Sequence, residues 1–320
     1  MNRLLAAVVV TVGCGGGSST PIDAPPDMLI DAPPPPLGHH HYVLDSVLVP
    51  TSNTTARDLG QDLNGDQAID NQLGMVLGTL SSMGLDVQQT TTQNIDRGAS
   101  ITLVDLFAND LTTEPAATFA AFVGSAPMPA ACASASDTVC RHHLGGNATF
   151  TVTAGAPTNP PLTGALVAGS MTTAPGHLAM PLVMFAGASP VLVNLIGAKV
   201  VLGAPAATKL GMLKIGGAIT AAEVDTKVIP GMRDGFAAIV MRDCTALSSP
   251  PTCGCPASSS GKTILDLFEQ APKDCMVSVT EVKTNSLIQA LLAPDVMIDG
   301  MMALSIGVKA TAVEAGFVAP

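Results

Sequence analysis

The chain has 320 residues, of which 47% are hydrophobic and 12% are charged, and its formal net charge is −11. A chain of this length can bury a core without help from a metal ion or a second chain. The acidic balance excludes nucleic acid as a partner, since phosphates require basic residues, and it excludes docking on anionic lipid by charge.

The first thirteen residues predict an export signal. One positive charge precedes an apolar core that is too short to span a bilayer. The core ends in "TVGC", residues 11–14, which resembles the lipobox of bacterial lipoproteins, although Thr11 stands where Leu is usual. The resemblance implies cleavage before Cys14 and lipidation of that cysteine. Because Gly15 follows and not Asp, it also implies the outer membrane.

Residues 14–38 predict a tether after the lipidated cysteine. Pro and Gly dominate "GGGSSTPIDAPPDMLIDAPPPPLG". Such a composition stays extended and does not pack. We therefore expect the tether to hold a single globular domain, residues 39–320, away from the membrane.

The globular part opens with the histidines of "HHHYVLDSVLVP", whose apolar alternation predicts a strand over about 42–49. A metal site built on residues 39–41 is one interpretation, but solvated or core histidine is the ordinary one. Helical spacing of apolar residues follows over 73–80, and a second short helix is expected near 86–97. "SITLVDLFAND" predicts the next strand.

Between the first strand and these helices, "DLNGDQAID" at 62–70 predicts a calcium loop. Side-chain oxygens stand at positions 1, 3, 5 and 9, and a backbone carbonyl stands at position 7. This spacing resembles an EF-hand or thrombospondin type 3 loop. The expected ligands are Asp62, Asn64, Asp66, the Ala68 carbonyl and Asp70, the last directly or through water.

Two departures weaken the calcium prediction. Gln67 stands where the EF-hand has Gly, and Leu73 stands where it has a bidentate Glu. A ligand from elsewhere, such as Asp58 or Asp45, is then needed. We expect a structural ion bound weakly, with a dissociation constant on the order of 10⁻⁴–10⁻³ M. The alternative is a polar turn that caps the following helix.

The second half of the chain predicts strands followed by helices. Residues 147–215 are apolar and strand-like, with turns at Pro and Gly as in a meander. Capping boxes at 220–223 and 278–281 open helices. The first is expected to run to about 243 with a kink or break at Pro230, and the second to stop before Pro294. Ser260 is expected to cap a short helix over 262–269.

The closing segment "MALSIGVKATAVEAGFV" predicts one or two strands. Strand-rich and helix-rich blocks are therefore partly segregated along the chain. This favours an α+β fold, with a mainly antiparallel sheet whose centre is meander-like, packed with several helices and stabilised by disulfides.

Besides Cys14, the chain contains an even number of cysteines, which in an exported protein suggests disulfides. They are Cys132, Cys140, Cys244, Cys253, Cys255 and Cys275. Cys132 and Cys140 close a short polar loop and are expected to pair.

Cys253 and Cys255 are a poor match for each other. Extended residues two apart lie about 6.6 Å from Cα to Cα, which is near the upper limit of disulfide geometry. We expect them to pair separately with Cys244 and Cys275, in an order that the sequence leaves open. A zinc site of four thiolates is the alternative.

The lipobox, the tether, "DLNGDQAIDNQLG" and the closing "LLAPDV…ALSIGV" together resemble uncharacterised envelope lipoproteins of soil delta-proteobacteria, especially myxobacteria. The resemblance implies a cell-envelope location and no particular activity. We expect a non-enzymatic domain, stabilised by calcium and disulfides, that binds or scaffolds an envelope protein.

Two other functions stay open. "PLVMF" and "VLVNLIG" are apolar on both strand faces, which a carrier of lipid or another amphiphile would use to line a cavity. A hydrolase without a recognisable motif is the third interpretation.

Overall fold

A computed structural model describes residues 38–320 except 83–85, 186–188, 246–248 and 251–252. The expected signal peptide 1–13, the lipidated Cys14 and nearly all of the tether 14–38 lie outside the described residues.

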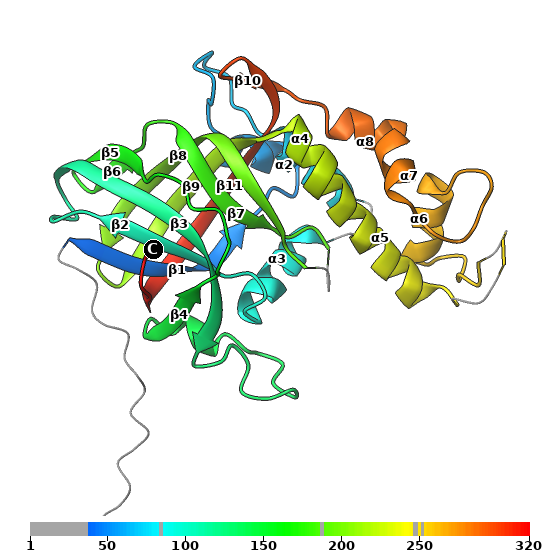
Figure 1. The fold of residues 1–320 in the computed structure, drawn as a ribbon, viewed down its shortest axis with the longest axis horizontal. Coiled ribbons are helices and arrows are strands. Elements are labelled where there is room, and N and C mark those ends of the chain that lie inside the picture. Colours follow the sequence, from blue (N-terminus) through cyan, green and yellow to red (C-terminus); the bar gives the residue numbers. More distant parts are fainter. Residues whose placement is uncertain (1–37, 83–85, 186–188, 246–248, 251–252) are drawn as a thin grey trace, which may run out of the picture. The chain divides into compact units, whose positions relative to one another are not determined.

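Eight antiparallel strands pair in sequence and close on themselves, because the last strand also pairs with the first (Figure 1). In order around the ring they are β1 (His39–Leu48), β2 (Thr102–Phe107), β3 (Glu114–Met128), β5 (Leu162–Val167), β6 (Ser170–Thr172), β8 (Val191–Ala206), β9 (Lys209–Thr220) and β11 (Met301–Gly316). The expected α+β fold with a mainly antiparallel sheet, helices and disulfides is confirmed.

Three further strands complete the 11-stranded sheet. They are β4 (Ala148–Val152), which follows the turn η1 (His142–Leu144), β7 (Gly176–Leu182) and β10 (Val296–Ile298). β4 pairs with β3 and runs parallel to the end of β11, β7 pairs with β8, and β10 forms a hairpin with β11.

Apolar side chains fill the inside of the closed sheet. Residues opposite each other in the ladder share a face, and buried pairs such as Leu106 with Phe119 and Leu202 with Leu213 line the interior. Tyr42 reaches across, and its hydroxyl donates to the Ala206 carbonyl at 3.0 Å. A closed sheet of this size has an interior that side chains can fill.

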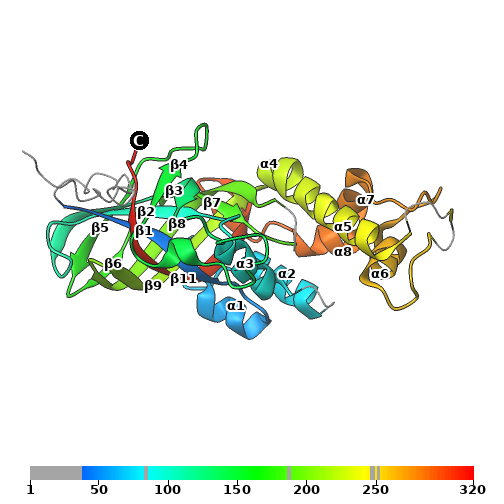
Figure 2. The ribbon, with the colours of Figure 1, turned by 90° about the horizontal axis from the view of Figure 1, so that it is seen from below.

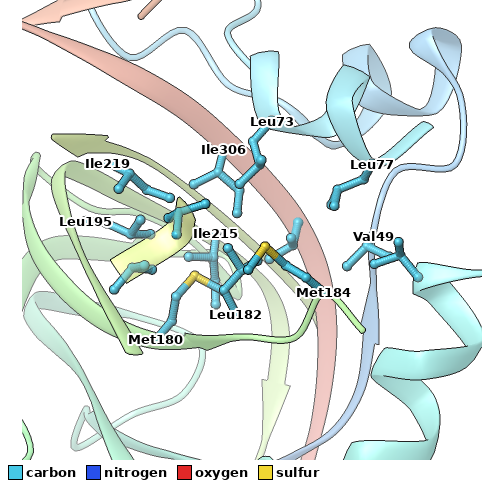
Figure 3. Packing of buried hydrophobic residues seen from close by; sticks show 14 of the residues in the cluster. Val49, Leu73, Leu77, Met180, Leu182, Met184, Leu195, Ile215, Ile219 and Ile306 are labelled. Carbon is cyan, nitrogen blue, oxygen red and sulfur yellow. The ribbon is translucent and has the colours of Figure 1, made fainter. Parts of the chain in front are cut away.

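The helices α1 (Asn53–Leu59), α2 (Gln72–Ser82) and α3 (Val87–Asp96) connect β1 to β2 and lie along one side of the sheet (Figure 2). Leu73 and Leu77 of α2 point toward the cluster of Ile306 and the methionines of the β7 segment (Figure 3). The helices expected over 73–80 and 86–97 are therefore confirmed.

A second helical group lies at one end of the sheet (Figures 1 and 2). It comprises α4 (Ala221–Glu223), a π-helical turn (Val224–Val228), α5 (Ile229–Asp243), α6 (Ser260–Phe268), α7 (Val279–Thr284) and α8 (Ser286–Leu291). Pro230 does not break the run. It is the second residue of α5 and directly follows the π-helical turn, so the helix is irregular at this point, as expected of a kink, and is not broken.

Two other predictions for this group were wrong in detail. Ser259, not Ser260, caps α6, because the Ser259 hydroxyl accepts the Lys262 N–H at 3.1 Å. The helix that opens at Ser278 ends at Thr284, because Asn285 leaves helical geometry and its side chain caps α8. No helix among the described residues is long and apolar enough to cross a membrane.

Three disulfides join cysteines in pairs. Cys132 bonds Cys140, as expected. The neighbours Cys253 and Cys255 pair separately, with Cys275 and Cys244 respectively. The alternative of a four-thiolate zinc site does not hold, since all four sulfurs are in disulfides.

Candidate functional site

The predicted calcium loop lies over β8 and β9, held by two lysines of those strands. The Lys199 ammonium donates to the Asp62 carbonyl at 2.8 Å, and the Lys214 ammonium donates to the Gly60 carbonyl at 3.1 Å. At its base, the loop closes through one bridge, in which the Asp70 N–H donates to the Gln61 carbonyl at 3.0 Å. The first end of the loop is therefore fixed to the sheet, and the second end is tied to the first.

Within the loop, polar side chains accept backbone N–H groups. The Asp62 carboxylate accepts from Gly65 at 2.6 Å and from Gln67 at 2.9 Å. The Asp66 carboxylate accepts from Ala68 at 2.8 Å. The bonds that Asp62 accepts, that from Gly65 first and that from Gln67 next, lower the pKa of Asp62. The loop is thus curled by the same residues that would supply ligands.

Asp70 is the buried member of the set, and its carboxylate accepts the Leu63 N–H at 2.8 Å. Burial raises the pKa of Asp70 above its ordinary value, and the negative charges of Asp295, Asp66 and Asp62 raise it further. The loop therefore gathers more negative charge around Asp70 than the protein groups beside it neutralise.

All five predicted ligands lie on this one loop, but the structure does not bring their carboxylates together as a tight group. Among the described residues, the carboxylates of Asp62, Asp66 and Asp70 do not form a trio with ligand atoms within 4.8 Å of one another. Gln67 has a φ of 70°, the left-handed conformation that Gly supplies in the EF-hand. Calcium binding stays a prediction.

An extra ligand from Asp58 or Asp45 stays a prediction, and Asp58 is exposed on α1. Asp45, one of the two candidates, accepts the Thr311 hydroxyl at 2.6 Å. The additional carboxylate that interacts with Asp70 is Asp295, at the start of the β10–β11 hairpin. Asp295 also accepts the N–H of Ser305 at 2.7 Å.

A second group of metal-ligating side chains joins the first two strands. His39, His41 and Asp105 each offer one ligand atom, and these atoms all lie within 4.8 Å of one another. His39 Nδ1 is 2.9 Å from Asp105 Oδ2, and His41 Nε2 is 3.8 Å from Asp105 Oδ1. Burial lowers the pKa of His41, while Asp105 opposes the shift.

The sequence interpretation treated these histidines as solvated or core residues and missed Asp105. The available signal was the His-x-His spacing within a strand, which places both rings on one face. Nothing in the sequence showed that β2 would present an aspartate opposite them. A further trio, Cys253, Glu269 and Cys275, offers no thiolate because both sulfurs are in one disulfide.

Two concave regions are relevant to the expected functions of amphiphile carrier and protein-binding domain. The cavity at one end of the closed sheet, between Leu44, Val104 and the side chains of α3 and β7, has a volume of about 40 Å³. A groove of about 400 Å³ lies between α5 and residues 274–279, with the exposed Met241 and Met276 on its walls. The inner cavity has room for about one water molecule, far less than the several hundred Å³ that a drug-sized ligand occupies.

Comparison of this chain with models of protein families, with curated proteins and with solved structures gives no match.

Proposed function

We propose that the chain is a non-enzymatic, lipid-anchored protein of the cell envelope, whose calcium- and disulfide-stabilised domain binds or scaffolds a protein partner. The observation that carries the calcium part is the environment of Asp70. A buried carboxylate whose pKa is raised by burial and by the charges of three further carboxylates favours a bound cation, which would offset their repulsion.

Three disulfides support the location, since such bonds persist in oxidising compartments outside the cytoplasm. The groove between α5 and 274–279 supports the binding role, because exposed methionines adapt to the surface of a partner. The carrier interpretation stays a prediction, and the cavity of about 40 Å³ gives it little support.

The test of the calcium part is thermal unfolding with and without calcium. With a dissociation constant of about 1 mM, 10 mM calcium stabilises the folded state by about 1.4 kcal/mol. For a chain of this size that corresponds to a rise in Tm of about 2 °C. Asp66→Asn should abolish the rise while changing the Tm without calcium only slightly, because the amide oxygen can still accept the Ala68 N–H.

Asp110→Asn is the matched control. Asp110 is also exposed and also accepts a backbone N–H two residues on, that of Thr112 at 2.7 Å, but it lies outside the loop. This variant should keep the full calcium response. An equal calcium response in Asp66→Asn and wild type would refute the ion site, as would no response in wild type.

A further inference from the structure

The pairing of β1 with β2 brings two histidines and one aspartate to a single patch. His39 and His41 are two residues apart on β1 and therefore point to the same face of the sheet. Asp105 stands directly opposite His41 in the antiparallel register, so its side chain shares that face. The face is the outer one, because Tyr42, the residue after His41, points into the closed sheet.

His41 is the unusual member of this cluster, because its ring is buried without a hydrogen-bond partner. The residue is 5% exposed, and neither ring nitrogen makes a hydrogen bond within the protein. Its ring stacks on Phe317 with centroids 4.2 Å apart, which fixes its plane. Nε2 faces Asp105 Oδ1 at 3.8 Å, which is too long for a hydrogen bond.

The separations between the three side chains suit a metal ion. In a tetrahedral zinc site, ligand atoms 2.0–2.2 Å from the ion lie about 3.3 Å from one another. Asp105 Oδ1 lies 3.0 Å from His39 Nδ1 and 3.8 Å from His41 Nε2, on either side of that value, and the ligand atoms of all three residues lie within 4.8 Å of one another. Two imidazoles and one carboxylate are ligands that zinc and similar transition metals accept, whereas calcium prefers oxygen alone.

We propose that His39, His41 and Asp105 bind a divalent transition-metal ion of the zinc type. His39 binds through Nδ1, with its proton moved to Nε2, and His41 binds through Nε2. Three protein ligands leave a fourth position for water or an external ligand. That position opens on the side of His39, whose side chain is 34% exposed, while those of His41 and Asp105 are 4% and 10% exposed.

The chain contains a natural control for an ordinary His–Asp contact. His142 Nε2 lies 2.9 Å from Asp137 Oδ2, the same distance as in the His39–Asp105 pair, but no third His, Cys, Asp or Glu ligand joins it among the described residues. His40 is a second control. It follows His39 on β1 but points to the other face, where Nε2 lies 3.1 Å from the Ala108 carbonyl.

The test is a zinc titration of the full chain, purified without an added histidine tag, by competition with a chromophoric chelator. We expect one zinc ion per chain. Losing a ligand should cost at least the 10–100-fold in affinity that losing an outer-shell partner costs. His39→Gln and Asp105→Asn should both show this loss, and His40→Gln and His142→Gln should bind zinc as wild type does. Cobalt in place of zinc should give the visible absorption of a four-coordinate site, lost in the same two variants.

Because His39 is only half-buried, His39→Gln should fold normally, and its circular dichroism spectrum and Tm without zinc check this. Zinc should raise the Tm of wild type and leave that of His39→Gln unchanged. The proposal is overturned if wild type binds no zinc, or if folded His39→Gln and Asp105→Asn bind it with unchanged affinity. A loss confined to His142→Gln would assign the zinc to an adventitious surface pair and would also overturn it.

Discussion

The side chain of Asn71 and the backbone of Gly307, 236 residues apart, form a reciprocal pair of hydrogen bonds. Asn71 Nδ2 donates to the Gly307 carbonyl at 3.0 Å, and the Gly307 N–H donates to Asn71 Oδ1 at 2.8 Å. The pairing of β1 with β11 ends at Leu48 and Lys309, so Gly307 lies beyond it. Asn71 therefore satisfies a buried strand edge as a neighbouring strand would.

Asn71→Ala should destabilise the protein by about 3 kcal/mol, because it leaves the Gly307 N–H and carbonyl buried without partners. The Ala56 carbonyl, which Asn71 Nδ2 also contacts at 2.9 Å, loses a donor as well. Urea unfolding measures the change. Asn53→Ala is the control, since Asn53 is exposed in the first turn of α1 and should change stability by less than about 0.5 kcal/mol. Equal effects of the two substitutions would show that the Gly307 contact contributes nothing specific.

Gly307→Ala should destabilise the protein for a different reason. The backbone of Leu59 and Gly60, just before the loop 62–70, lies close against Gly307. A Cβ at Gly307 would lie 2.6 Å from the Leu59 carbonyl oxygen and 2.8 Å from Gly60 Cα. We expect destabilisation of about 2 kcal/mol from this overpacking.

Gly211→Ala tests that interpretation. Gly211 lies in β9, the strand paired with β11, and a Cβ there would meet no atom within 4 Å. An alanine there should be neutral or slightly stabilising, because glycine in a strand interior costs about 0.5 kcal/mol or more. If both variants lose the same stability in urea, the cost at Gly307 is not steric.

Much of this architecture was predictable, because local patterns determine it. The alternation in β1, the helical spacing in α2, the N-cap bond at Thr220 and the capping box at Ser278 all operate within a few residues, although Glu223 accepts the Asn194 N–H and so leaves the box expected at 220–223 incomplete. β3 was missed, since its alanines and two prolines give little strand signal. It forms because it pairs with β2 on one edge and with β4 and β5 on the other.

The candidate sites divide in the same way. The loop 62–70 is contiguous, so its oxygens were visible as a spacing. The contribution of Asp295 was not, because it comes from a hairpin more than two hundred residues later. Asp105 likewise joins His39 and His41 only through the register of β1 on β2. Closure of the sheet was also not readable, since it depends on the pairing of the first strand with the last.

Asp70→Asn should stabilise the calcium-free protein at neutral pH. The pKa of Asp70 is raised in the folded state, so the folded protein holds the Asp70 proton more tightly than the unfolded chain does. The free energy of unfolding therefore falls as pH rises from the ordinary value of 3.8 through the folded pKa, and the full cost is present above it. Asparagine removes the charge and can still accept the Leu63 N–H.

Urea unfolding of wild type and Asp70→Asn at several pH values, with a chelator present, measures this cost. The advantage of the variant should shrink as pH falls through 3.8, because below that value wild-type Asp70 becomes protonated in both states. An advantage that does not depend on pH would mean that charge is not its cause. Added calcium should stabilise wild type and not the variant.

Removing the Cys253–Cys275 disulfide should loosen the helical group without unfolding the sheet. The bond closes a loop of 22 residues, for which chain entropy gives a stabilisation of about 3 kcal/mol. That loop contains α6, whose buried Ile264, Leu265 and Phe268 hold it to the core. Once the link is cut, α6 can open separately, because its attachment to the core then rests on those side chains and its contacts with α5.

Hydrogen exchange followed by mass spectrometry distinguishes local from global loosening. In a variant with both Cys253 and Cys275 changed to alanine, amides of α6 should exchange faster, while those of β8 and β9 should change little. The control changes Cys132 and Cys140 to alanine. This removes a disulfide between cysteines 8 residues apart, next to η1, and should leave α6 unaffected. Unchanged protection of α6 in the first variant would show that its packing alone holds it. Faster exchange in β8 and β9 as well would show that the helices and the sheet unfold as one unit.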